Sequence, residues 1–188
     1  TCLPVGLGVY ISGGPRDPSP AEVRVKPIIC IIVPLQNDTK TTMANNLLKG
    51  KRGIIFGALD ENSIAWKTAL KVKEEGGSFT LTNAPIAMRL GKINELAKAC
   101  DAEVIPADAT SEEDLRNLFT KSIDVLGGKM DFILHSIGMS PNIRKGKEYG
   151  DMNYEWYLKT LDISALSFHK VMQTAEKLDG MNEWGSIV

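Results

Sequence analysis

The sequence has few cysteines, no long apolar run and no excess of charge of either sign. Its three cysteines, Cys2, Cys30 and Cys100, are odd in number and include no CxxC pair, which argues against a disulfide framework and a zinc site. The 22 basic and 23 acidic residues form no basic stripe for nucleic acid or an anionic membrane. The apolar run at 28–35 is too short to span a bilayer and contains proline. These absences predict a cytoplasmic protein whose partner is a small molecule or another protein.

The residue pattern changes near residue 42. Residues 1–42 hold six of the nine prolines and show no helical or strand period. We therefore expect 1–42 to be a non-native or disordered extension of a domain that occupies 43–188. The alternative is an additional strand at 28–33.

Strand and helix patterns alternate from residue 53 onward. Short apolar runs predict strands at 53–56, 78–82, 103–107, 130–135 and 185–188. Helical spacing predicts helices at 63–75, 85–100, 111–126 and 154–178. Strict alternation predicts an α/β fold with a doubly wound, Rossmann-like parallel sheet that binds its ligand at the carboxyl ends of the strands.

The corner between the first strand and the first helix is typical of phosphate binding. Gly57 permits a backbone conformation closed to other residues and lets a ligand approach. The helix beginning near Ser63 offers free N–H groups and a positive dipole end to a pyrophosphate. The GxGxxG fingerprint is absent, so by itself the corner fits an ordinary strand-to-helix turn equally well.

Several motifs occur together in a fixed order. Gly57 is followed by five residues and Ser63-x-Ala65, HSIG occupies 135–138, and DISALSF occupies 162–168. From residue 46 to 188 the chain resembles the bacterial NADH-dependent enoyl-acyl carrier protein reductases of the short-chain dehydrogenase/reductase superfamily. The resemblance implies reduction of trans-2-enoyl thioesters on acyl carrier protein in fatty acid elongation. It also implies that Met43 is the true start and that 43–188 is an incomplete Rossmann-type dinucleotide-binding domain. The complete protein would be a homotetramer or homodimer.

The adenosine half of the cofactor has candidate contacts after the second and third strands. Thr82 stands where a Rossmann domain commonly carries an acidic residue for the ribose, and the resemblance favours NADH, while nearby Arg89 leaves NADPH open. The resemblance assigns Asp108 and Ala109 to the adenine ring, and a carboxylate accepts a bond from the exocyclic amine. The alternative is that Asp108 caps the following helix. At the first corner the candidate cofactor-binding residues are Gly57, Ser63 and Ile64.

The fourth strand leads into candidate contacts for the nicotinamide half. The resemblance places Ser136, Ile137 and Gly138 beside the nicotinamide and its ribose. Met139 and Ser140 follow where the substrate meets the cofactor, and an ordinary loop explains these two equally well.

Two other features receive structural interpretations. His135 ends an apolar strand, which is typical of a hydrogen-bonded core residue rather than a general acid. An aromatic cluster lies downstream without interleaved basic residues, so we interpret it as core and helix start rather than a base-stacking platform. Its members are Tyr149, Tyr154, Trp156 and Tyr157.

The resemblance implies a catalytic Tyr-x6-Lys segment after the fifth strand, and none occurs there before Val188. No catalytic residue and no metal ligand is therefore assigned, and we expect this chain to be an inactive, unstable amino-terminal fragment. One alternative is a non-catalytic dinucleotide-binding module. Another is a different short-chain dehydrogenase, which would carry closely spaced glycines in place of Ser63 and Ala65.

Overall fold

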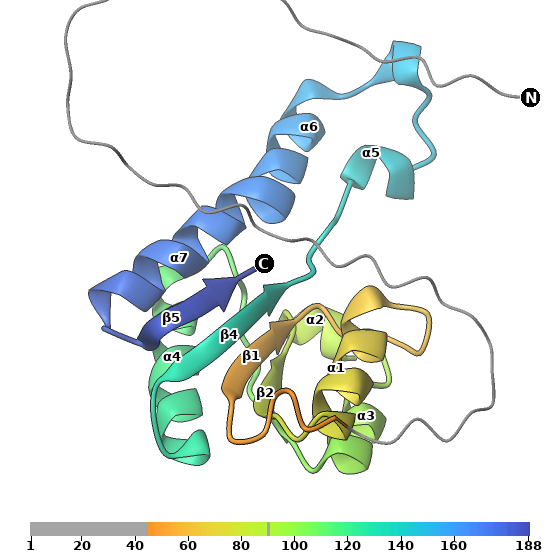
Figure 1. Cartoon of the computed structure of the whole chain (residues 1–188). Coiled ribbons are helices and arrows are strands. Elements are labelled where there is room, and N and C mark those ends of the chain that lie inside the picture. Colours follow the sequence, from red (N-terminus) through yellow and green to blue (C-terminus); the bar gives the residue numbers. More distant parts are fainter. Residues whose placement is uncertain (1–44, 90) are drawn as a thin grey trace, which may run out of the picture. The chain divides into compact units, whose positions relative to one another are not determined.

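The computed structural model describes residues 45–89 and 91–188, which are built around a five-stranded parallel sheet (Figure 1). Its strand order is β3-β2-β1-β4-β5, so β2 and β3 extend the sheet on one side of β1, and β4 and β5 extend it on the other. The predicted doubly wound parallel sheet is confirmed. The strands are β1 (Arg52–Phe56), β2 (Ser78–Thr82), β3 (Glu103–Val104), β4 (Met130–His135) and β5 (Met181–Ile187). The predicted extension at 1–42 and the alternative strand at 28–33 lie outside the described residues.

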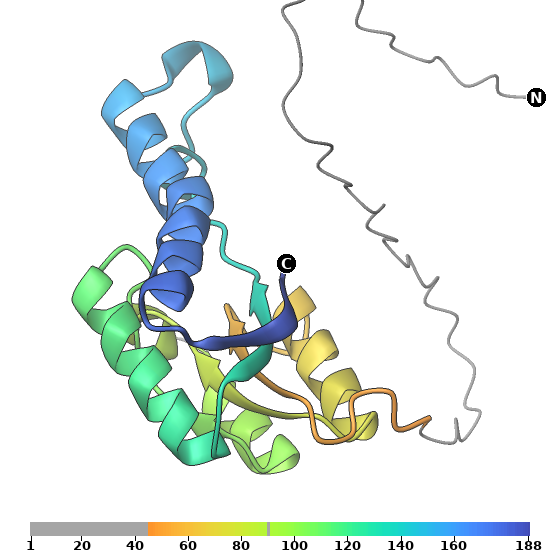
Figure 2. The ribbon, with the colours of Figure 1, turned by 60° about the vertical axis from the view of Figure 1, so that its left-hand side comes forward.

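Helices cover both faces of the sheet (Figures 1 and 2). On one face lie α1 (Ile64–Glu74) and α3 (Ile93–Cys100), and on the other lie α4 (Glu112–Leu126) and α7 (Ser167–Lys177). Ile54 and Ile55 are neighbours in β1 and are fully buried, yet they belong to separate apolar clusters. Because consecutive side chains of a strand point to opposite faces, both faces of β1 are buried, and its sequence is a continuous apolar run.

Serine side chains cap the amino ends of α1 and α4. The Ser63 hydroxyl accepts a hydrogen bond from the Trp66 amide at 3.4 Å, and Ser111 caps α4 in the same way. Gly127 ends α4 with a φ of 71°, in the left-handed region that glycine adopts without strain.

The predicted helix over 85–100 is wrong, because the structure has two helices there. They are α2 (Pro85–Met88) and α3. The Lys92 amide donates to the carbonyl of Leu59 at 2.8 Å, and a Cβ at Gly91 would lie 2.6 Å from the same oxygen. The chain therefore packs against the loop between β1 and α1, and the Lys92 amide bonds to that loop instead of to a carbonyl of a continuous helix.

Two predicted strands differ in extent from the structure. β3 ends at Val104 instead of residue 107, although the Ile105 amide still donates to Leu81 and the Ala107 amide to Asn83. Pro106, between them, has no N–H to donate. β5 begins at Met181 instead of residue 185, because Asn182 and Glu183 interrupt any apolar run at its start.

The predicted long helix over 154–178 is present but contains an irregularity. It consists of α6 (Tyr154–Leu161), a π-helical segment η2 (Asp162–Leu166), and α7. Figures 1 and 2 show α6 and the short α5 (Pro141–Arg144) beyond the carboxyl ends of the strands. A 3₁₀ turn at Tyr149–Asp151 precedes α6.

The interpretation of the aromatic cluster as core is wrong, whereas its interpretation as a helix start is confirmed because α6 begins at Tyr154. Tyr149 is 91% exposed, Tyr154 and Tyr157 are also exposed, and Trp156 is half-buried, so the cluster forms no core. Tyr149, Tyr154 and Tyr157 line a pocket of about 440 Å³.

No helix among the described residues combines the length and the apolar composition that crossing a bilayer requires. Within 45–89 and 91–188, no three His, Cys, Asp or Glu side chains are grouped to hold a metal ion.

Candidate functional site

Three central strands end level with one another at one edge of the sheet. Phe56 of β1 pairs with Thr82 of β2 on one side and with His135 of β4 on the other. The residues that follow these strands therefore lie side by side, at the point where the strand order reverses. That is where doubly wound sheets bind their ligands, and it is where the predicted cofactor motifs converge.

Gly57 is required by backbone packing at this edge. Its φ is +87°, and a Cβ there would lie 1.9 Å from the Ser136 carbonyl oxygen. Its amide donates to the carbonyl of Thr82 at 3.1 Å. We expected Gly57 to make room for a ligand, but the exit of β4 fills the space that a side chain would take.

The loop after Gly57 closes on Ser63. The Ser63 hydroxyl donates to the Asp60 carbonyl at 2.7 Å and accepts from the Leu59 amide at 3.3 Å. Ile64, the first residue of α1, is 73% exposed. The start of α1 is thus rigid and open to solvent, and its positive end favours an anion.

The end of β2 carries a side-chain hydroxyl, that of Thr82, without a hydrogen-bond partner among the described residues. Thr82 is fully buried. The neighbouring Asn83 uses its side-chain amide, which donates to the Ala58 carbonyl and accepts from the Ala84 amide. A buried hydroxyl without a partner costs about 1–3 kcal/mol, so Thr82 is a candidate for a role beyond packing.

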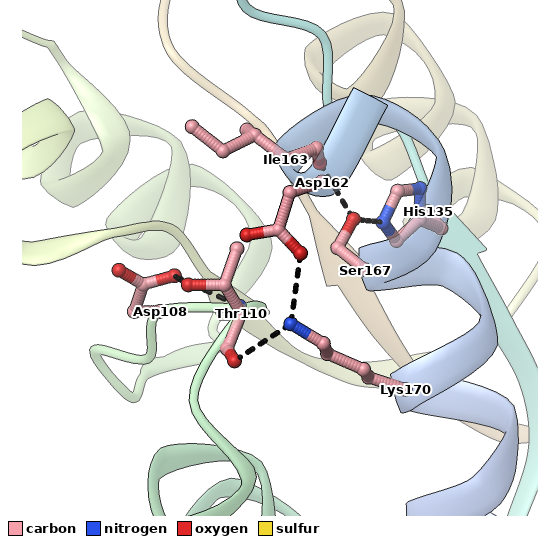
Figure 3. Close-up of polar contacts among 7 residues, drawn as sticks. All are labelled: Asp108, Thr110, His135, Asp162, Ile163, Ser167 and Lys170. Atoms are coloured by element: carbon pink, nitrogen blue, oxygen red, sulfur yellow. Dashed lines mark hydrogen bonds and ion pairs between the residues drawn. The ribbon is translucent and has the colours of Figure 1, made fainter. Parts of the chain in front are cut away.

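Asp108 shapes the loop between β3 and α4. One of its carboxylate oxygens accepts from the amide and from the hydroxyl of Thr110, both at 2.8 Å. The other oxygen points away from Thr110 (Figure 3). The helix cap is Ser111, so the alternative role of Asp108 as a cap is wrong. Ala109, beside it, is buried.

His135 is a half-buried, hydrogen-bonded residue, which confirms its structural interpretation. Its Nε2 lies 2.8 Å from the Ser167 hydroxyl, which itself donates to the Ile163 carbonyl at 2.6 Å (Figure 3). Because that hydroxyl has a single hydrogen, His135 Nε2 is the donor to it. The ring packs between Phe56 and Phe168. Burial lowers the pKa of His135, which favours the neutral imidazole.

The segment after β4 is partly open. A Cβ at Gly138 would meet no atom within 4 Å, so packing does not require glycine there and space remains beside it. Ile137 packs partly against the core under α4 and α7, and Ser136 is half-buried.

Met139 and Ser140 are more ordered than a simple loop. The Met139 amide donates to the Ser164 hydroxyl at 3.0 Å, and this hydroxyl donates back to the Met139 carbonyl. Ser140 caps α5 by accepting from the Ile143 amide. The π segment η2 thus holds the chain that leaves β4.

The motif at 162–168 is recognisable in the sequence, but the bonds that its residues and Lys170 make to distant segments are not. Ser164, Ser167 and Lys170 each bond to a loop or strand distant in sequence, at Met139, His135 and Thr110 respectively. Their motif has the spacing of an unbroken helix, so its pattern carried no signal for these contacts.

A family model described as enoyl-(acyl carrier protein) reductase matches residues 57–188. Among curated relatives, the enoyl-(acyl-carrier-protein) reductase (NADH) 1 of Rhizobium meliloti is 32% identical over 146 residues, covering 77% of this chain and 52% of the relative. The corresponding FabI protein of Rickettsia bellii is 31% identical over 147 residues, covering 78% and 55%. The chain spans about half the length of the curated relatives it matches.

Solved structures of enoyl-(acyl-carrier-protein) reductases are also similar to this chain. The FabI–NADH complex from Alistipes finegoldii has a TM-score of 0.74 and 59% sequence identity, covering 76% of this chain and 50% of that one. The reductase of Anaplasma phagocytophilum in complex with NAD has a TM-score of 0.64 and 27% identity, covering 74% and 52%.

Proposed function

Because the chain belongs to the enoyl-(acyl carrier protein) reductase family, we propose that it carries the NADH-binding residues of a reductase acting on trans-2-enoyl thioesters of acyl carrier protein. The observation that carries this proposal is the convergence of the family's motifs at the level ends of β1, β2 and β4. Bound NADH would supply the hydride for the carbon–carbon double bond.

The residues at this edge fit a dinucleotide. The open amino end of α1, next to Ser63 and Ile64, suits a pyrophosphate because it offers N–H groups and positive potential. Thr82, with its unpartnered hydroxyl, is our candidate for the adenosine ribose. Asp108, beside Ala109, presents a carboxylate oxygen that can accept a hydrogen bond from the adenine amine.

The nicotinamide half would lie along the exit of β4. Ser136, Ile137 and the open space at Gly138 would line it. Met139 and Ser140 would face the substrate, and η2 orients them through Ser164. These residues bind and orient, and none is assigned to the proton transfer.

We also propose that the complete protein works in the cytoplasm as a homotetramer or homodimer. Support for self-association comes from the apolar side chains that α6 and η2 leave exposed among the described residues. These side chains are Tyr154, Leu158, Leu161 and Leu166.

Binding and turnover by the 188-residue chain test the proposal. We expect NADH to bind saturably, because the pyrophosphate, ribose and adenine contacts all come from this chain. We expect no loss of NADH absorbance with crotonyl thioester, because the family's Tyr-x6-Lys segment is not in the sequence. The measurements are a fluorescence titration and an absorbance assay on the same preparation. Absence of NADH binding would refute the proposal, and turnover above background would refute the expected inactivity.

Two threonines of β2 separate a cofactor role from a structural role. Thr82→Val removes the unpartnered hydroxyl and keeps the side-chain shape, so we expect the free energy of unfolding to stay level or rise by up to about 1 kcal/mol. If the hydroxyl serves the ribose, NADH binds several-fold more weakly.

Thr80→Val is the matched control, because the buried Thr80 hydroxyl bonds to that of Ser122 at 2.8 Å. We expect it to lower the free energy of unfolding by about 1–2 kcal/mol and to leave NADH affinity unchanged. Urea unfolding and NADH titration measure both effects. Unchanged NADH affinity in Thr82→Val would remove Thr82 from the cofactor site.

A further inference from the structure

A polar network joins the β3–α4 loop to the helix that contains η2 (Figure 3). The Lys170 ammonium donates to the Thr110 carbonyl at 3.2 Å and to an Asp162 carboxylate oxygen at 2.9 Å. Lys170 belongs to α7, Asp162 to η2, and Thr110 to the loop that also carries Asp108. One lysine thus connects two segments that contribute to opposite halves of the candidate site.

The π segment makes the pairing of Lys170 with Asp162 possible. The two residues are eight positions apart, and at about 100° per residue a regular α-helix would place them roughly 80° apart around its axis. A π segment accommodates an additional residue, so the pair behaves as if about seven positions apart and lies within roughly 20°. The lysine side chain then reaches toward the helix amino end, where Asp162 lies.

A second contact holds η2 from the other side. Ser167 donates to the carbonyl of Ile163 in η2 and accepts from His135 at the end of β4. The position of η2 is therefore tied to the sheet, and Lys170 is anchored to a part of the helix that is itself fixed.

The backbone of Thr110 is held through its N–H and through its carbonyl. Its amide donates to Asp108, and its carbonyl accepts from Lys170. The amide of Asp108 donates in turn to the Asp114 carboxylate of α4 at 2.9 Å. Because Asp108 is bonded to Thr110 through one carboxylate oxygen and to Asp114 through its amide, the other carboxylate oxygen of Asp108 has one defined direction.

We propose that Lys170 is a positioning residue for the adenosine half of a bound dinucleotide: it fixes the Thr110 carbonyl and thereby aims the free carboxylate oxygen of Asp108 at the adenine amine. The inference rests on the proposed function and names a residue that sets the strength of that binding. Lys170 does not itself touch the cofactor.

Variants of Lys170 in the 188-residue chain test the inference. Lys170→Met keeps the length of the side chain and removes the donor, so the dissociation constants of NADH and ADP-ribose should rise about tenfold, or ~1.4 kcal/mol. The dissociation constant of reduced nicotinamide mononucleotide, which lacks adenosine, should not change. Lys170→Arg should restore most of the affinity, since a guanidinium also offers several donors. Lys177→Met, at an exposed position of the same helix, is the matched control and should bind like the parent chain.

Each outcome decides the question. Unchanged NADH affinity in Lys170→Met, or an equal loss for NADH and reduced nicotinamide mononucleotide, would overturn the positioning role. Circular dichroism and urea unfolding establish that the variant folds. If Lys170→Met does not fold, Asp162→Asn, which leaves Lys170 in place, is measured instead. It should weaken the binding of adenosine-containing ligands alone, by a smaller factor than Lys170→Met. Unchanged affinity for those ligands in Asp162→Asn would overturn the inference. Failure of the parent chain to bind NADH would instead refute the proposed function, and this inference with it.

Discussion

Gly57→Ala is expected to lower the free energy of unfolding by about 3 kcal/mol. Part of the cost, about 1 kcal/mol, comes from placing an alanine at a φ of +87°. The rest comes from the new Cβ, which would lie 1.9 Å from the Ser136 carbonyl oxygen and must push β1 and β4 apart where they leave the sheet. Urea unfolding followed by circular dichroism measures the change.

Gly127→Ala separates these two contributions. Gly127 also has a positive φ, of 71°, but a Cβ there meets nothing within 4 Å. Its expected cost is the conformational part alone, about 1 kcal/mol. Equal losses in the two variants would contradict the close approach of β1 and β4 at Gly57.

Asp131→Ala should be the second most destabilising change, at about 2 kcal/mol at neutral pH. The Asp131 carboxylate accepts from the Arg52 amide at 2.9 Å, from Lys51 at 3.1 Å and from Asn182 at 3.2 Å. It therefore links β1, β4 and β5 at the amino edge of the sheet. Its side chain is only 15% exposed, so water replaces these bonds poorly in the variant.

The effect of Asp131 should depend on pH in a defined direction. Burial alone would raise the pKa of Asp131, but its hydrogen bonds to Arg52, Lys51 and Asn182 outweigh burial and hold that pKa below its usual value. The unfolded chain then takes up this proton at a higher pH than the folded chain does. The stabilisation is complete above the unfolded pKa of about 4 and is lost as the pH falls through the lower folded pKa.

Urea midpoints of the parent chain and Asp131→Ala should therefore differ at neutral pH and converge as the pH falls through the lowered pKa of the folded chain. Asp179→Asn provides a control, because asparagine tolerates the φ of 49° at this position and removes only the charge. Asp179 pairs with Lys129 but is 83% exposed, and loss of its charge should change stability by less than about 1 kcal/mol at any pH. A constant difference between the parent chain and Asp131→Ala across pH would contradict the pKa argument.

The sequence predicted the elements whose boundaries are local. β2 and β4 have the predicted bounds because apolar runs adjoin glycine pairs, and α1 and α4 begin after serine caps. The sequence did not predict boundaries that depend on contacts between residues distant in the chain. The break between α2 and α3 depends on the bond from Lys92 to Leu59. The π segment η2 is held by the bonds between Ser164 and Met139 and by the bond from Lys170 to Asp162.

The candidate site shows the same division. The strand pattern selected Thr82 and the resemblance selected Ser136. The fold brings both to one edge, since parallel strands of matching register place their ends together. The roles of individual atoms were not accessible. Only the packing between strands and helices shows that the Ser136 carbonyl leaves no room for a Cβ at Gly57. The same holds for the bond from Lys170 to the Thr110 carbonyl.

An NADH titration of the isotope-labelled 188-residue chain, followed by amide NMR shifts, tests the central claim most directly. The account predicts saturable shifts at the carboxyl edge of the sheet, at Gly57, Ile64, Asp108 and Ile137, and none at Asp131 on the opposite edge. Shifts confined to the amino edge, or no saturable shift, would contradict the assignment of this edge as the NADH site.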